Sequence, residues 1–128
     1  MGEYRNIDKY NPMDYNTSMQ TIVELPEFIK RSDKLLSVTE KDELINHLAK
    51  YAKSGDLMTG TGGIRKLRWS AQGKGKSGGV RVIYYYYNKS IPLFLLTAFG
   101  KGEKANLSKA ERNELAKLTK LLKESYGV

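Results

Sequence analysis

Lysine and arginine side chains dominate one third of this 128-residue sequence, and they are the residues best suited to chemistry. Residues 60–104 contain nine basic side chains and one acidic side chain, so this segment alone accounts for the formal charge of +8. Clustered cations neutralise phosphates, and this neutralisation drives affinity for nucleic acids. The pattern therefore indicates a polyanion site, although a solvated basic face that aids solubility would have the same composition.

The run Ile64–Trp69 has the residue types of a β-strand, in which successive side chains point to opposite faces. Lys66 and Arg68 therefore share one face, while the apolar residues that follow each of them can enter the core. Cations on a stiff sheet are well placed to contact phosphate or to stabilise a transition state. Arg81, at the start of the next strand, joins them if strand pairing brings it to the same face. Solubilising charge remains the alternative for this strand taken alone.

Two glycine-containing segments carry further lysines. The loop 73–78, with Lys74 and Lys76, has the letters of a dinucleotide fingerprint, but a strand follows it where that motif needs a helix. We therefore interpret it as a basic loop that contacts a phosphate backbone, or as a soluble connection. The turn after the last strand places Lys101 and Lys104 near the sheet edge where Arg81 begins, with an ordinary polar turn as the alternative.

The residue types absent from the sequence exclude several kinds of site. There is no cysteine and a single histidine, His47. A disulfide scaffold, thiol catalysis, a cysteine-ligated metal site and a histidine metal cluster are therefore excluded, and we expect no metal or other cofactor. Apolar runs are too short to span a membrane and the polar start is no signal peptide, so we expect a soluble, cytoplasmic protein without a membrane partner.

The basic residues need elements that position them, and the apolar pattern predicts one domain over residues 19–128. Residues 1–18 are polar and tyrosine-rich, and we interpret them as a disordered arm, or as a start-site artefact if Met19 is the true start. The predicted order is a strand, two helices, three antiparallel strands and a helix, which is an α+β fold. The predicted strands are 21–25, 64–70, 80–87 and 91–98, and the predicted helices are 26–36, 40–53 and 109–126. The second helix has Thr39 as its N-cap and a left-handed glycine cap at Gly55, and the last helix follows a capping box at Ser108.

The two strands of the predicted hairpin differ in what they bury. Ile91–Ala98 is apolar at both alternating positions, which predicts a central strand covered on both sides. Only three residues separate it from the preceding strand, so the two strands form an antiparallel hairpin. The tyrosine run 84–87 could stack bases, but core and cross-strand packing is the favoured interpretation.

Four segments, taken in this order, resemble the RelE superfamily of bacterial toxins, most closely its HigB-like branch. These segments are 62–69, 73–79, 80–85 and 95–104, and the resemblance runs from about Met19 to about Leu122. It implies a microbial RNase-like RelE fold, with the N-terminal strand and helices packed on an antiparallel sheet. It also implies a toxin of a type II toxin-antitoxin system that cuts mRNA in the ribosomal A site through its 2′-hydroxyl, without a metal.

The resemblance also implies partners and residue roles. The partners are the ribosome, mRNA and a cognate antitoxin of helix-turn-helix type. Lys66 matches the position of the proton acceptor, and Arg68 and Arg81 match those of transition-state stabilisers, with the charge of Arg81 expected outside the core. The candidate RNA contacts are Arg65, Lys74, Lys76, Lys101 and Lys104, of which Lys101 matches the basic position after the last strand of the family.

This sequence departs from the family pattern at two points. Gly102 stands where RelE has an arginine, and no tyrosine stands near Leu107 or Ser108, where the C-terminal catalytic position falls. Lys104 is a candidate to compensate. Two alternatives therefore remain open: a ParE-like toxin that inhibits gyrase, and a non-catalytic RNA-binding module. The basic face favours cleavage over gyrase inhibition.

Overall fold

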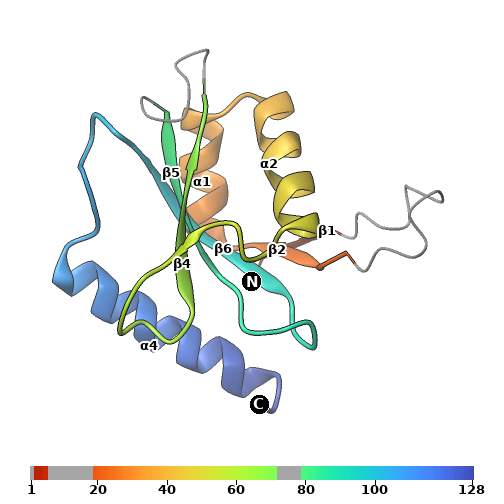
Figure 1. Cartoon of the computed structure of the whole chain (residues 1–128). Coiled ribbons are helices and arrows are strands. Elements are labelled where there is room, and N and C mark those ends of the chain that lie inside the picture. Colours follow the sequence, from red (N-terminus) through yellow and green to blue (C-terminus); the bar gives the residue numbers. More distant parts are fainter. Residues whose placement is uncertain (1, 6–18, 72–78) are drawn as a thin grey trace.

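The computed structural model describes residues 2–5, 19–71 and 79–128, which form a six-stranded sheet with helices on both of its sides (Figure 1). This arrangement confirms the α+β fold. The sheet order is β1-β2-β6-β5-β4-β3. The strands are β1 Glu3–Arg5, β2 Ile22–Glu24, β3 Asp56–Leu57, β4 Ile64–Trp69, β5 Val80–Tyr85 and β6 Leu93–Gly100, and the helices are α1 Pro26–Leu35, α2 Val38–Lys50 and α4 Lys109–Ser125. Among these helices, none is long and apolar enough to cross a membrane.

Each face of the sheet buries its own apolar cluster. One cluster, the helix-pair core, joins residues of α1 and α2, such as Phe28 and Leu44, to Val82 of β5. The other, the α4 core, joins Leu122 of α4 to Ile83 of β5. Figure 1 shows α1 and α2 together on one side of the sheet and α4 on the other. Side-chain alternation along each strand therefore decides which helices a residue faces.

Strand β6 lies in the middle of the sheet, as its apolar sequence predicts. It pairs with β5 in the antiparallel direction and with β2 in the parallel direction, so the sheet is mixed. The expected purely antiparallel sheet is wrong in this respect, because the chain passes through α1 and α2 before it returns to the strand beside β2. Residues Leu95 and Phe94 lie in opposite clusters, and the predicted double coverage of β6 is confirmed.

The N-terminus of α2 differs from its predicted position. The N-cap is Ser37, two residues before the expected Thr39. Ser37 Oγ accepts a hydrogen bond from Glu40 N at 3.1 Å, and Glu40 Oε1 accepts one from Ser37 N at 2.8 Å. This reciprocal capping box satisfies two backbone donors, which a cap at Thr39 would leave without side-chain partners.

The end of α2 also differs from the prediction. The helix ends at Lys50, before the expected glycine cap at Gly55, and Gly55 has no positive φ. Its lack of a side chain serves close packing instead, since a Cβ atom there would lie 2.8 Å from Cε1 of the Tyr84 ring. The Gly55 N–H donates to the Tyr84 hydroxyl at 2.9 Å.

Two short edge strands lie outside the sequence-based prediction. Strand β1, residues 3–5, falls in the segment interpreted as an arm and pairs with β2. Strand β3, residues 56–57, pairs with β4. Segments of two or three residues are too short to show an alternating pattern, and only their strand partners identify them. The rest of the predicted arm, residue 1 and residues 6–18, lies outside the described residues.

Candidate nucleic-acid interface

The register of β4 and β5 brings the predicted cations together. Arg68 lies directly opposite Arg81, and Lys66 lies opposite Ile83. Ile83 belongs to the α4 core, so alternation places all three basic residues on the sheet face that α4 covers in part. Lys66, Arg68 and Arg81 therefore share one face, as the sequence-based hypothesis required. We call Lys66, Arg68, Arg81 and Lys104 the basic face.

The members of this face differ in exposure. Arg68 is exposed and Lys66 is half-buried, whereas Arg81 is only 8% exposed. The expectation that the charge of Arg81 lies outside the core is wrong, because β5 is an inner strand and Phe99 of β6 pairs with Arg81 on its other side. A guanidinium in such a site is held in one geometry and is partly shielded from water, which strengthens its attraction for a phosphate.

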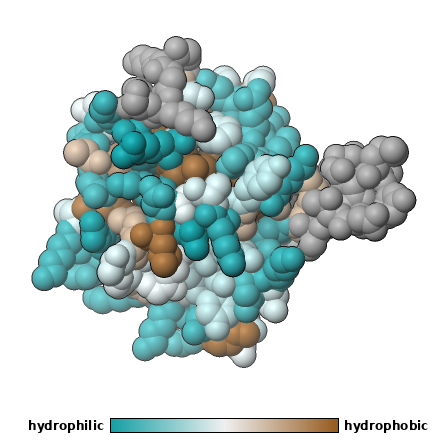
Figure 2. Space-filling model, viewed as in Figure 1, coloured by the Kyte–Doolittle hydropathy of each residue, from teal (hydrophilic) through white to brown (hydrophobic). Residues whose placement is uncertain are grey.

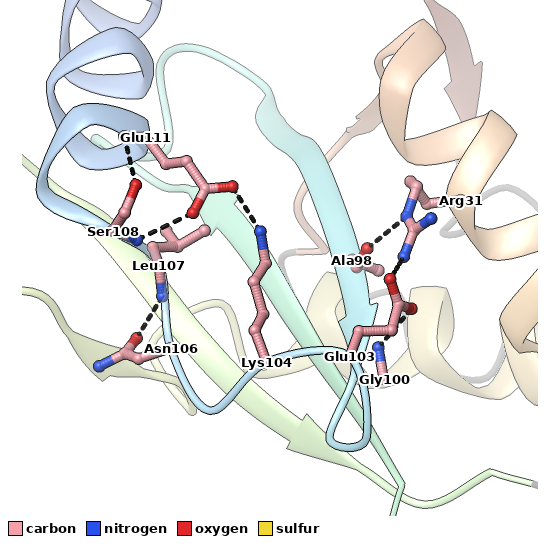
Figure 3. A network of polar contacts seen from close by, with 9 residues as sticks. All are labelled: Arg31, Ala98, Gly100, Glu103, Lys104, Asn106, Leu107, Ser108 and Glu111. Carbon is pink, nitrogen blue, oxygen red and sulfur yellow. Dashed lines mark hydrogen bonds and ion pairs between the residues drawn. The ribbon is translucent and has the colours of Figure 1, made fainter.

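Lys104 completes the face from the segment between β6 and α4. Its ammonium lies over the Phe99 ring, 5.0 Å from the ring centroid, and forms an ion pair with Glu111 (Figure 3). Since Phe99 is the cross-strand neighbour of Arg81, Lys104 approaches the two arginines from the β6 side. The candidate compensating cation therefore lies over the cross-strand neighbour of Arg81.

Asn106 is a member of the site that sequence reasoning missed. Its Oδ1 lies 3.4 Å from the ammonium of Lys66 and accepts a hydrogen bond from Leu107 N at 2.9 Å. The two partners, Lys66 and Asn106, are 40 residues apart in the chain. No local pattern marks this contact, because it forms only when the fold brings the segment before α4 to the side chain of Lys66.

The acidic residue within the basic third of the sequence, Glu103, is directed away from the basic face. Figure 3 shows Glu103 reaching to Arg31 of α1, while its neighbour Lys104 reaches towards α4. Arg31 Nε also donates to the Ala98 carbonyl at 3.0 Å, and Glu103 Oε1 accepts from Gly100 N at 3.0 Å. These contacts remove a negative charge from the candidate phosphate site and fix the turn after β6.

The pKa of Glu103 gives this turn a predicted pH dependence. The hydrogen bond from Arg31, then the one from Gly100 N, holds the pKa of Glu103 below its usual value of 4.5, and the charge of Lys104 adds to this. A lowered carboxyl pKa contributes stability above the unfolded-state pKa, and this contribution is lost as the pH falls through the folded-state value. The Glu103→Gln variant should therefore be less stable than the wild type at neutral pH, and the difference should shrink below about pH 4.5. Urea unfolding from pH 3 to pH 7 tests this expectation, and a difference independent of pH would contradict it.

Arg65 lies on the opposite face from its neighbours in β4. It pairs with Tyr84 of the helix-pair core, and its guanidinium donates to the carbonyls of Lys53 at 3.1 Å and Gly55 at 2.8 Å. Tyr84 donates to the Ala52 carbonyl at 2.7 Å, and burial raises the pKa of this phenol. Arg65 and Tyr84 thus fasten the chain that follows α2 to the sheet, and Arg65 does not join the basic face.

This placement makes a prediction for Arg65. The Arg65→Gln variant should lose about 1.5–3 kcal/mol of unfolding free energy, the usual contribution of hydrogen bonds from a charged group, and should bind RNA as well as the wild type. Lys66→Gln should have the opposite profile, with weaker RNA binding and near-native stability. Urea unfolding and fluorescence anisotropy with labelled RNA measure both properties. A stable Arg65→Gln protein with weakened RNA binding would show that Arg65 contacts RNA instead.

The remaining predicted contacts are placed only in part. Lys101 is exposed, and its backbone N–H donates to the Gly79 carbonyl at 3.2 Å, two residues before Arg81. Lys74 and Lys76 lie outside the described residues. Tyr84 and Tyr85 are buried, which confirms core packing for these two members of the tyrosine run.

A large apolar groove lies apart from the basic face. It has a volume of about 760 Å³ and is lined mainly by leucines of α4, β6 and the start of α1, such as Leu118, Leu96 and Leu25. Its lining includes Glu111, the partner of Lys104. The view in Figure 2 shows a mostly hydrophilic surface with separate hydrophobic patches. The residues of the basic face therefore lie outside this groove.

An α+β domain that gathers cations from two strands and from the segment before α4 on one face has features typical of proteins that bind polyanions. The family model described as the RelE toxin of the RelE/RelB toxin-antitoxin system matches residues 28–126. The chain therefore belongs to the RelE toxin family, and its arrangement of helices and strands is consistent with the RelE fold. Membership implies a toxin with a cognate antitoxin as its partner.

Proposed function

We propose that this toxin is a ribosome-dependent endoribonuclease of the HigB-like branch, which cuts mRNA in the A site and so inhibits translation. The observation that carries the proposal is the register of β4 and β5, which sets Arg68 opposite Arg81 with Lys66 on the same face. Two arginines facing each other repel, and a phosphate between them is attracted by both. Such a face favours RNA cleavage over gyrase inhibition.

The proposed reaction uses the RNA itself as the nucleophile. Lys66 accepts the proton of the 2′-hydroxyl, whose oxygen attacks the adjacent phosphorus and forms a 2′,3′-cyclic phosphate. The bond from phosphorus to the 5′-oxygen breaks, and this oxygen takes a proton from solvent or from one of the cations. Arg68 and Arg81 stabilise the extra negative charge of the phosphorane.

The proposal includes the ribosome, mRNA and a cognate antitoxin as partners. The basic face is open, so the ribosome must present and orient the mRNA, which accounts for a requirement for translation. In this proposal Lys74, Lys76 and Lys101 contact RNA phosphates. A helix-turn-helix antitoxin neutralises the toxin. No metal or cofactor takes part in the proposed steps, because the cations of the chain supply the charge.

The proposal is tested by inducing the protein in bacterial cells and mapping mRNA 5′ ends with and without a translation inhibitor. The expected result is new 5′ ends within translated codons, which disappear when initiation is blocked or when the start codon of a reporter mRNA is removed. Cuts that persist without translation would contradict ribosome dependence. Growth arrest with DNA damage and no new mRNA ends would favour gyrase inhibition instead.

A further inference from the structure

The capping boxes of α2 and α4 have the same geometry. At the start of α4, Ser108 Oγ accepts from Glu111 N at 3.1 Å, and Glu111 Oε1 accepts from Ser108 N at 2.8 Å. Ser37 and Glu40 make the same two bonds, at the same distances, at the start of α2. A capping box uses one carboxylate oxygen of its glutamate. In α4 the second oxygen, Glu111 Oε2, holds the ammonium of Lys104.

The ammonium of Lys104 is restrained by two contacts. Its ammonium is attracted by the Phe99 ring, 5.0 Å from the ring centroid, and by the carboxylate of Glu111 (Figure 3). A free lysine samples many rotamers, so these contacts select the one that keeps its charge beside the cross-strand neighbour of Arg81. The pKa of Glu111 is lowered, first by the hydrogen bond from Lys104 and then by the one from Ser108 N.

The charge of Glu111 opposes one part of the proposed function. A carboxylate close to a phosphate site repels the phosphate and weakens binding. Glu111 can therefore assist the reaction only through the geometry that it imposes on Lys104. When this carboxylate is neutralised, the cleavage rate should therefore fall, while the affinity for RNA should not fall with it.

We infer that Glu111 is a positioning residue, which caps α4 and in addition holds Lys104 over Phe99 for contact with the reacting phosphate. The inference rests on the proposed nuclease function. The capping box at the start of α4 fixes the position of Glu111 Oε2, and this oxygen holds Lys104 where it can compensate for the missing arginine.

The Glu111→Gln variant separates the two roles of Glu111. Glutamine keeps the oxygen that accepts from Ser108 N, so the cap is retained, but it loses the charge that holds Lys104. Single-turnover cleavage of ribosome-bound mRNA should fall roughly tenfold or more, the order of loss caused by a misplaced reacting group. The half-saturating concentration of toxin should stay the same or decrease. Glu40→Gln, the same change in the capping box of α2, should have wild-type cleavage.

Two further measurements test whether Glu111 acts through Lys104. Adding Glu111→Gln to a Lys104→Met protein should cause no further loss of cleavage rate, since the positioned group is already absent. The Lys104→Met change alone should raise the pKa of the Glu111 carboxyl in an NMR titration, because its main partner is removed.

The outcomes distinguish this inference from the proposed function. If the wild type cuts ribosome-bound mRNA and Arg81→Gln does not, but Glu111→Gln cuts at the wild-type rate, the positioning role is wrong and the nuclease function stands. Equal losses in Glu40→Gln and Glu111→Gln would show a capping effect only, and would also overturn the inference. If the wild type cuts no mRNA, both fail.

Discussion

Replacing Arg81 by glutamine should lower the rate of ribosome-dependent mRNA cleavage by roughly 10²–10³-fold, the loss typical for one preorganised transition-state contact. Arg81 is 8% exposed and lies between Arg68 and Phe99, so its guanidinium is held in place before the RNA arrives. Glutamine retains much of the aliphatic stem and removes the charge. Expression of the variant should therefore relieve growth arrest.

The control must separate loss of charge from loss of folding, since Arg81 is buried. Lys120→Gln removes the same charge from an exposed position on α4 and should leave cleavage unchanged. Circular dichroism and urea unfolding report whether Arg81→Gln keeps its fold. A folded Arg81→Gln protein that cleaves mRNA at the wild-type rate would show that the basic face is not catalytic.

Replacing Lys41 by alanine should cost about 3–5 kcal/mol of unfolding free energy, which is a large part of the stability of a domain of this size. The Glu24 side chain is fully buried in β2, and the Lys41 ammonium of α2 lies 2.6 Å from Glu24 Oε1. Without Lys41, a buried carboxylate loses the charge that compensates its burial. Chemical denaturation followed by tryptophan fluorescence measures the loss, since Trp69 packs against the helix-pair core.

The matched control replaces both members of this ion pair. A Glu24→Leu, Lys41→Met protein buries no charge at this position and should recover most of the stability that Lys41→Ala loses. A Lys41→Ala protein within 1 kcal/mol of the wild type would contradict this account of how α2 is held on the sheet. The pair lies on the face opposite the basic one, so RNA binding by the folded proteins should be unchanged.

The sequence contains enough information for the elements and for part of the site. Long apolar runs and the capping box at Ser108 predict the inner strands and α4 within a few residues. Alternation in β4 correctly places Lys66 and Arg68 on one face. Arg81 could be added only conditionally, because its register against Arg68 is set by the packing of the whole sheet.

Other parts of the site depend on contacts between distant segments. Arg31 and Glu103 are 72 residues apart, and their pairing follows from α1 lying beside the end of β6. Lys66 and Asn106, which are 40 residues apart, are likewise brought together only by the fold. In the sequence, Arg65 looks like another member of the basic run. In the structure, its guanidinium instead donates on the other face to the carbonyl oxygens of Lys53 and Gly55, which follow α2.

The most direct test of the basic face as a ribosome-dependent nuclease uses purified ribosomes with one mRNA codon placed in the A site. The protein should cut this mRNA and leave a 2′,3′-cyclic phosphate, and it should not cut the same mRNA without ribosomes. An mRNA with a single 2′-deoxynucleotide before the scissile phosphate should remain intact, because its nucleophile is missing. Cleavage of the deoxy mRNA, or equal cleavage of free mRNA, would contradict the account.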